Sequence, residues 1–119
     1  MFLELGHTKL PIYSITRKFV LECYRAVKLL PPEEKFVLSQ QIRRAALSVH
    51  LNFAEGSSKH SNAERKRYYE IARSSIVEID SALDVAEDLG YLNKEILGDL
   101  GESMKLCFKQ LSNLINSIG

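Results

Sequence analysis

The chain has 119 residues, 45% of them hydrophobic and 26% charged, which fits one globular domain that buries its own core. No apolar stretch approaches the length of a membrane span, and the first residues lack the basic and apolar regions of a secretion signal. The sequence therefore predicts a cytoplasmic protein with no membrane partner.

The net charge of +1 predicts no partner by itself, but the charge is unevenly distributed. Residues 1–73 carry 13 Lys and Arg against 7 Asp and Glu, a balance of +6. Residues 74–119 carry 3 against 8, a balance of −5. Such a split is typical of a charged partner surface or of self-complementary assembly, although solvated helix faces also differ by chance.

The first two predicted helices are separated by a proline pair. Apolar residues recur at three- and four-residue steps over residues 11–30 and predict a helix that Pro31 and Pro32 end. A second apolar stripe predicts a helix over about residues 33–55, with Gly56 as its stop. Apolar side chains cover most of the circumference of this second helix, so we expect its extra face to meet another subunit.

Two further helices are predicted on the same kind of evidence. Ser61 and Glu64 form a capping-box pattern that begins a third helix, which continues to Leu89 and stops at Gly90. Asn93 is a suitable N-cap for a fourth helix, which carries apolar residues in alternating three- and four-residue steps.

Short links between long amphipathic helices favour antiparallel neighbours. The predicted fold is therefore all-α, an antiparallel up-down-up-down four-helix bundle over residues 11–119, with an irregular N-terminal arm over residues 1–10. Cys23 and Cys107 fall on apolar helix faces without metal-type spacing, so we expect both in the core.

The residues that a bundle uses for catalysis or metal binding form no recognisable set. His7, His50 and His60 lack zinc-ligand spacing, and a Glu-x-x-His motif occurs once, in the arm. No nucleophile elbow or P-loop spacing is present, and Ser48 and His50, two apart on a helix, point in different directions. We therefore expect no enzyme, no cofactor and no metal.

Polar side chains interrupt the apolar second helix. We expect them to form hydrogen bonds and ion pairs inside an assembly, with contact to a ligand or nucleic acid as the alternative. Arg44 and Glu55 are expected to pair across helices, and Asn52 to fix register in a helix seam. The members of this predicted polar network are Gln41, Arg43, Arg44, His50, Asn52, Glu55, Glu78 and Asp80. Glu78 and Asp80 belong to the third helix and are the residues with which Arg44 and Glu55 are expected to pair.

A longer pattern runs through the second, third and fourth segments. Its parts are residues 39–49 (SQQIRRAALSV), 52–56 (NFAEG), 67–76 (RYYEIARSSI), 78–80 (EID) and 89–92 (LGYL). In these parts the chain resembles the small bacterial four-helix-bundle proteins named for the intervening sequences of 23S rRNA genes. His50 stands where that family often has Pro, and Ser74 stands where it often has Gly. At residues 36–38 the chain has Phe-Val-Leu, with Val37 in place of the Gly of a more usual Phe-Gly-Leu.

The resemblance implies a homo-oligomeric ring, with a pentamer favoured. It also implies kinship with the accessory protein of diversity-generating retroelements, which has the same fold, binds nucleic acid and partners a reverse transcriptase. The expected partners are therefore further copies of the chain, and RNA, DNA or a nucleic-acid enzyme.

Two function classes remain open at the level of sequence. One is a non-catalytic oligomeric scaffold with modest nucleic-acid binding, and the other is a protein-binding assembly module with no nucleic-acid role. For the first, the start of the third helix offers a basic cluster in which Tyr68 or Tyr69 stacks on an unpaired base. The expected nucleic-acid-binding residues are Lys59, Arg65, Lys66, Arg67, Arg73 and Tyr69, with His60 beside them. A solvated helix start is the alternative, although basic residues there oppose the helix dipole.

Overall fold

The structure, a computed structural model, describes residues 1–118 and shows four α-helices among them and no β-strand. The α-helices are α1 (Pro11–Val27), α2 (Leu38–Ser57), α3 (Asn62–Asp88) and α4 (Gly98–Ser117). Two short 3₁₀ helices, η1 (Gly6–Lys9) and η2 (Pro32–Glu34), precede α1 and α2. The prediction of an all-helical fold with four helices is confirmed.

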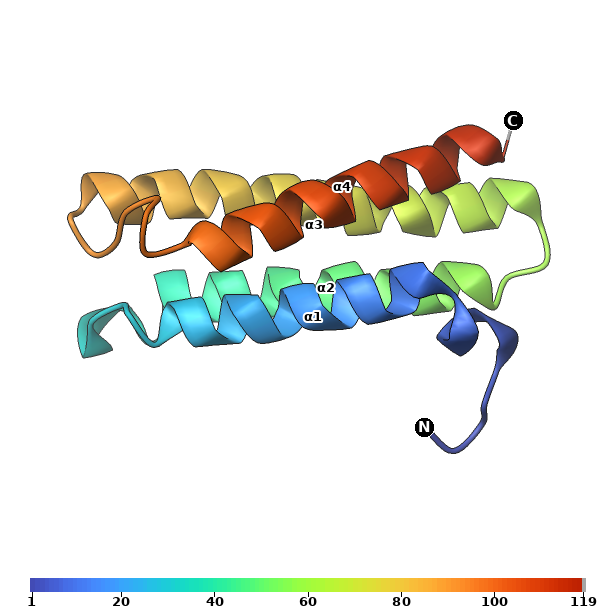
Figure 1. The fold of residues 1–119 in the computed structure, drawn as a ribbon, viewed down its shortest axis with the longest axis horizontal. Coiled ribbons are helices and arrows are strands. Elements are labelled where there is room, and N and C mark those ends of the chain that lie inside the picture. The colour runs from blue at the N-terminus through green and yellow to red at the C-terminus, as the bar shows by residue number, and fades with distance from the viewer. Residues whose placement is uncertain (119) are drawn as a thin grey trace.

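The helices lie in two layers, α1 beside α2 and α3 beside α4 (Figure 1). α2 packs against α1 and α3, and α4 packs against the same two helices. The chain turns back at each link, so the α1–α2 and α3–α4 links lie at one end of the molecule (Figure 1). The arm and the α2–α3 link lie at the other end. The longest dimension, 44 Å, matches the length of about 40 Å expected for the 27 residues of α3.

Both α2 and α4 begin later than the sequence predicts, because separate turns precede them. Glu34, expected in the first turn of α2, closes η2 and accepts hydrogen bonds from the Leu38 amide at 3.4 Å and the Tyr91 hydroxyl at 2.9 Å. Asn93 Oδ1 accepts from the Ile96 amide at 2.9 Å and forms a turn before α4. Glu34 and Asn93 match helix-start signals in the sequence, but in the structure each belongs to the turn that precedes its helix.

The predicted ends of α3 are confirmed. Ser61 Oγ accepts a hydrogen bond from the Glu64 amide at 3.1 Å, as an N-cap does. At the other end Gly90 has a φ of 81°, and the Tyr91 amide donates to the Ala86 carbonyl at 3.0 Å. This pattern is a Schellman motif, in which glycine takes the left-handed position.

The prediction that Gly56 ends α2 is wrong. The helix continues to Ser57, and Gly56 is buried against α3. A Cβ atom at this position would lie 2.9 Å from Tyr68 Cβ and 2.9 Å from Tyr69 Cε1. Glycine is therefore needed here for the close approach of two helices and not for a turn.

The core is formed by the helix faces that the periodicity predicts. Buried residues at the predicted stripe positions are Ile12, Phe19, Cys23, Ala26, Leu30, Ile42, Ala45, Val49, Phe53, Ala72, Ser75, Ile79, Ala86, Leu100, Cys107 and Leu111. The two cysteines are free thiols, and burial raises the pKa of each to about 12. They act as small apolar core residues, as expected.

Two apolar surfaces remain outside the core. Leu47 and Leu51, one turn apart on the outer face of α2, are exposed, so the apolar excess of this helix does face away from the subunit. The second surface is the arm, residues 1–10, which the sequence predicted to be irregular and which contains η1. The arm leaves the α1–α2 layer on the side away from α3 and α4 (Figure 1).

Candidate nucleic-acid and assembly surfaces

The turn between α2 and α3 is held by its own Lys59 and by Arg65 near the start of α3. Lys59 Nζ lies 3.1 Å from Glu55 Oε1, and this hydrogen bond raises the pKa of Lys59. Arg65 Nε donates to the carbonyl oxygen of Lys59 at 2.7 Å. Two predicted nucleic-acid contacts therefore have partners within the subunit.

Tyr68 is half-buried beneath two cations. Lys59 Nζ lies 5.3 Å and the Arg67 guanidinium 5.5 Å from the centre of its ring. Both distances fit cation–π interactions. An unpaired base that stacks on Tyr68 would have to displace one of these cations.

Tyr69 is a core residue, so the prediction that it contacts nucleic acid is wrong. Its side chain is only 5% exposed, and its ring stacks on Phe53 with centroids 5.9 Å apart. Its hydroxyl lies 3.0 Å from Ser57 Oγ. Tyr69, Ala72 and Ile76 are spaced along one helix face, and all three side chains are buried.

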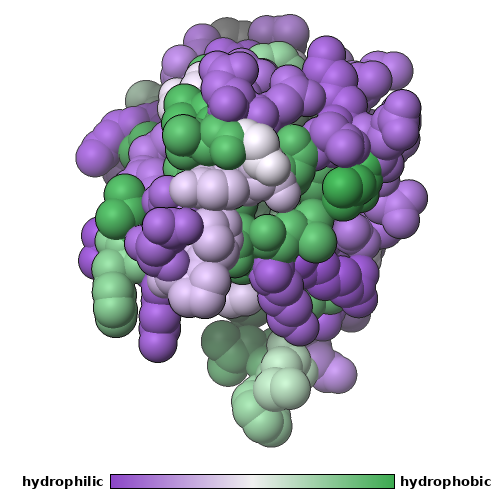
Figure 2. Space-filling model, turned by 90° about the vertical axis from the view of Figure 1, so that its left-hand side faces the viewer, coloured by the Kyte–Doolittle hydropathy of each residue, from purple (hydrophilic) through white to green (hydrophobic). Residues whose placement is uncertain are grey.

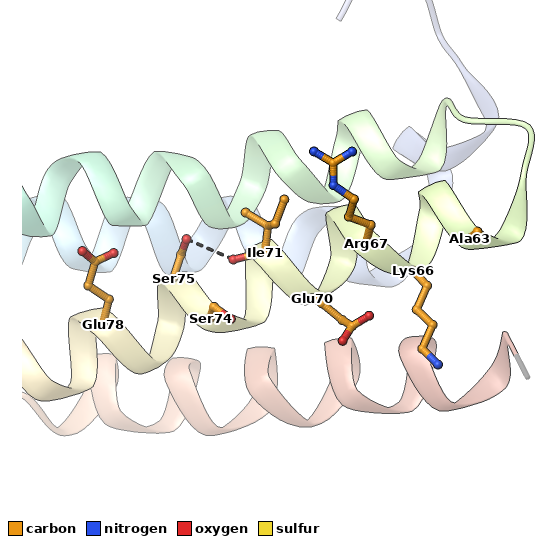
Figure 3. A pocket seen from close by; sticks show the side chains of 8 residues that line it. All are labelled: Ala63, Lys66, Arg67, Glu70, Ile71, Ser74, Ser75 and Glu78. Atoms are coloured by element: carbon orange, nitrogen blue, oxygen red, sulfur yellow. Dashed lines mark hydrogen bonds between the residues drawn. The ribbon is translucent and has the colours of Figure 1, made fainter.

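The remaining cations of α3 lie on different sides of the helix. Arg67 points toward α2, whereas Lys66 and Glu70 point toward α4 (Figure 3). Arg73 Nη1 donates to Ser112 Oγ at 3.2 Å, and its guanidinium lies 5.9 Å from the centre of the Phe108 ring on α4. The structure therefore gathers Lys59 and Arg67 around Tyr68, with Arg65 bonded to the Lys59 carbonyl, but does not bring Arg73 to them.

A shallow groove along α3 connects regions of opposite charge. It is lined at one end by Lys66 and Arg67 and at the other by Glu78, with Ile71 and Ser75 between them (Figure 3). Any extended partner that occupies it must meet both signs of charge.

The expected ion pairs across helices are not formed. Among residues 1–118 the ion pairs are Arg25–Glu22, Lys59–Glu55 and Lys105–Glu102, each between neighbouring turns. Among residues 1–118 of one subunit, Arg44 and Glu55 therefore do not pair with Glu78 or Asp80, and pairing between subunits stays a prediction. Arg44 and Asp80 are exposed, and Arg43 Nη2 donates only to the Lys35 carbonyl at 3.4 Å.

Side-chain hydrogen bonds, rather than ion pairs, join α2 to α3. Gln41 Nε2 donates to Glu78 Oε1, and the Ser75 hydroxyl donates to Ser48 Oγ at 2.8 Å. Asn52 Nδ2 donates to the carbonyl and hydroxyl oxygens of Ser48, both at 2.9 Å. Asn52 therefore bonds within its own helix and reaches α3 only through Ser48.

His50 lies on the opposite side of α2, against α1. Its Nδ1 is 2.7 Å from Thr16 Oγ1, and its ring centre is 4.8 Å from that of Tyr13. Burial lowers the pKa of His50, and the positive charge of Arg17 lowers it further. The residue is a half-buried structural group with a neutral ring at pH 7.

Two further apolar surfaces are not evident from the sequence pattern. At the end of the bundle that carries the α1–α2 and α3–α4 links, apolar residues gather among hydrophilic ones (Figure 2). Phe36, Val37 and Ile96 are exposed in those links. A groove between α3 and α4 has a floor of apolar residues that includes Val77 and Phe108.

Within residues 1–118, no group of three or more His, Cys, Asp or Glu side chains is arranged to hold a metal ion. None of the helices in this part of the chain combines the length and apolar composition needed to cross a membrane.

The profile of the 23S rRNA-intervening sequence protein family matches residues 8–114. This chain belongs to that family. A crystal structure of a protein of unknown function from the S23 ribosomal protein family of Bacteroides thetaiotaomicron VPI-5482 has the same fold, with a TM-score of 0.79. The two chains are 24% identical over 87% of this one and 97% of the other. No curated protein matches the chain.

The part of α2 in which the sequence was predicted to resemble this family is largely a packing surface. Ser39, Ala46, Phe53 and Gly56 of this helix are all buried. These positions explain the shared fold, since they set the contacts of α2 with α1 and α3. They do not by themselves define a binding site.

Proposed function

We propose that this chain is a non-catalytic scaffold that assembles into a closed ring of copies, a pentamer before other sizes, and binds nucleic acid weakly at one end. The observation that carries the proposal is the separation of charge along α3. Residues 62–73 of this helix carry four basic and two acidic side chains, whereas residues 74–88 carry five acidic and no basic ones. Each subunit is thus a rod, up to 44 Å long, with a basic and an acidic end.

Exposed apolar residues support the assembly. Leu47 and Leu51 share the outer face of α2, and Ile71 of α3 is exposed as well. Ile71 lies one turn from Ser75, whose hydroxyl bonds Ser48 of α2, so the three apolar side chains belong to one side of the bundle. Head-to-tail contacts between unlike surfaces close into a ring where the rotation permits.

The basic end supports nucleic-acid contact. Lys66, Arg67 and His60 are exposed there, and in a ring they would recur once per subunit, so that weak contacts add through avidity. Binding of this kind depends little on sequence and falls steeply with salt, because it releases counterions from the phosphates.

The test is a charge reversal at two exposed cations, one of which, Arg67, lies over the Tyr68 ring. Arg65 is left intact because it holds the Lys59 carbonyl. The double substitution Lys66→Glu with Arg67→Glu is compared with Lys28→Glu and Lys94→Glu, which makes the same charge change at exposed sites toward the other end.

Binding of a fluorescent single-stranded RNA is measured by anisotropy over a salt series. We expect the first variant to lose binding and the control to retain it. Removal of one phosphate-binding cation should reduce the slope of log K against log salt by about 0.7 for a single strand. Equal binding by both variants, or no binding by the native protein at low salt, would overturn the nucleic-acid part of the proposal.

A protein-binding assembly module with no nucleic-acid role is the second candidate. It is favoured by the internal partners of Lys59, Arg65 and Arg73, which leave fewer cations free than the sequence suggests. In that case the native protein assembles but does not retain RNA.

A further inference from the structure

The first residues of the arm carry apolar side chains that no part of their own subunit covers. Met1 is 93%, Phe2 90% and Leu3 78% exposed. Large apolar side chains grouped in this way normally mark a contact surface. Glu4, which follows them, has a φ of 47°, a left-handed conformation that non-glycine residues rarely adopt. An extended arm on another surface would release that bend.

The groove between α3 and α4 has the chemistry to receive such a segment. Its floor is formed by Ile76, Val77, Met104 and Phe108, of which Val77 is 52% and Phe108 40% exposed. The charged residues that line its rim are Lys105, Lys109 and Asp80, and the guanidinium of Arg73 lies over the Phe108 ring, so cations outnumber the one carboxylate. An apolar segment that is followed by an acidic side chain, as Met1–Leu3 is followed by Glu4, matches this combination of floor and rim.

The arm cannot reach this groove within one subunit. Residues 1–5 span at most about 17 Å when fully extended. They start beside the α1–α2 layer, at the end of the molecule where α3 begins (Figure 1). Val77 lies 15 residues into α3, about 22 Å along the helix and in the other layer. An arm that docks in this groove must therefore belong to another copy of the chain.

A second possible docking site for the arm is the end patch, the exposed apolar side chains of Phe36, Val37 and Ile96 in the two links. The charged residues around the two surfaces favour the groove over this end patch. The apolar side chains of the two links, such as Phe36 and Ile96, stand beside the acidic residues Glu33 and Glu95. Lys35 Nζ also lies 5.4 Å from the centre of the Phe36 ring, so this end carries both signs of charge. The groove carries Lys105, Lys109 and Arg73 against Asp80, and this excess of cations attracts the carboxylate of Glu4.

We infer that Met1–Leu5 of one copy dock in the α3–α4 groove of the next copy, with Phe2 and Leu3 on Val77 and Phe108. The carboxylate of Glu4 then faces the ammonium groups of Lys105 and Lys109. This inference rests on the proposed self-assembly and names the contact that joins successive copies, since arm and groove are different surfaces of each subunit.

Cross-linking tests the contact directly. Chains carrying Leu3→Cys are co-expressed with chains carrying Val77→Cys, and disulfides between copies are resolved on a non-reducing gel. The native Cys23 and Cys107 are buried thiols whose pKa is raised to about 12, so they do not compete. The matched control pairs Leu3→Cys with Phe36→Cys, at the end patch.

We expect a strong dimer band with Val77→Cys and little with Phe36→Cys. In a second measurement, Phe2→Ser with Leu3→Ser should raise the concentration at which copies dissociate, by light scattering, at least about tenfold, or about 1.4 kcal/mol. Leu21→Ser, at an exposed apolar site on α1, should not.

A native protein that is assembled but shows equal bands, or an unchanged dissociation concentration in the double variant, would overturn the docking of the arm alone. A native protein that is monomeric at micromolar concentration would overturn the assembly and this contact together. RNA binding by the monomer would still be measurable in that case.

Discussion

Replacing Gly56 with Ala tests whether the close approach of α2 and α3 stabilises the fold. The added Cβ would lie 2.9 Å from Tyr68 Cβ and 2.9 Å from Tyr69 Cε1, closer than real Cβ contacts come. Tyr68 Cβ is fixed to the backbone of α3. The Tyr69 ring is held by stacking on Phe53 and by its hydroxyl contact with Ser57. The two helices must therefore move apart to admit a methyl group.

Two opposing terms set the size of the effect. Overpacking a tight core contact costs about 1–3 kcal/mol, and two contacts of this kind favour the upper half of that range. Alanine recovers about 1 kcal/mol over glycine inside a helix. We expect a net loss of about 1–2 kcal/mol in the free energy of unfolding, measured by urea denaturation with far-ultraviolet circular dichroism. The protein concentration is held fixed, because self-association adds to the apparent stability.

Gly101→Ala is the matched control. Gly101 also lies within a helix, but no atom comes within 4 Å of a Cβ built there. The same substitution should therefore stabilise the protein by about 0.5–1 kcal/mol. Opposite signs at the two glycines are the expected result. A Gly56→Ala protein at least as stable as the native one would refute the packing argument.

Three further changes test individual contacts by the same unfolding assay. Ser61→Ala removes the cap on the Glu64 amide and should cost about 1 kcal/mol, with no change in stability if the cap is irrelevant. Gly90→Ala forces a side chain into a φ of 81° and should cost about 1–2 kcal/mol, whereas an equally stable protein would contradict the Schellman motif. Burial and then Arg17 lower the pKa of His50 below 6.5, so its unfolded form takes up protons first as the pH falls. The stabilisation from its neutral ring is complete above about pH 6.5 and is lost as the pH falls through the folded-state pKa. His50→Gln should flatten that decline, and an unchanged pH profile would assign it to other groups.

Periodic spacing was sufficient to predict four helices, because each buries one face along its length. It was insufficient for the starts of α2 and α4. The carboxylate of Glu34 bonds both the Leu38 amide and the hydroxyl of Tyr91, which is 57 positions away. A contact so distant in sequence leaves no local signal, so the turn before α2 could not be distinguished from its first helical residues.

The choice between Tyr68 and Tyr69 shows a similar limit at the candidate site. Adjacent residues on a helix point about 100° apart, and either tyrosine fits a three- and four-residue pattern with the small residues that follow. Burial of Tyr69 is decided by Phe53 and Gly56, which belong to another helix. The same rotation scatters Lys66, Arg67 and Arg73, which sequence proximity suggests as one cluster.

The positions of the two proposed surfaces on α3 make their roles separable. Arg67 and Val77 are ten residues apart, about 15 Å along the helix, and Arg67 points toward α2 whereas Val77 lines the groove beside α4. Exposed charges farther apart than a Debye length of about 8 Å interact little at physiological salt. Charge reversal at Lys66 and Arg67 should therefore leave the assembly intact while it removes nucleic-acid binding. If that reversal also dissociates the copies, the basic end lies inside the contact between them, and the acidic residues 74–88 of the neighbouring copy become its natural partner.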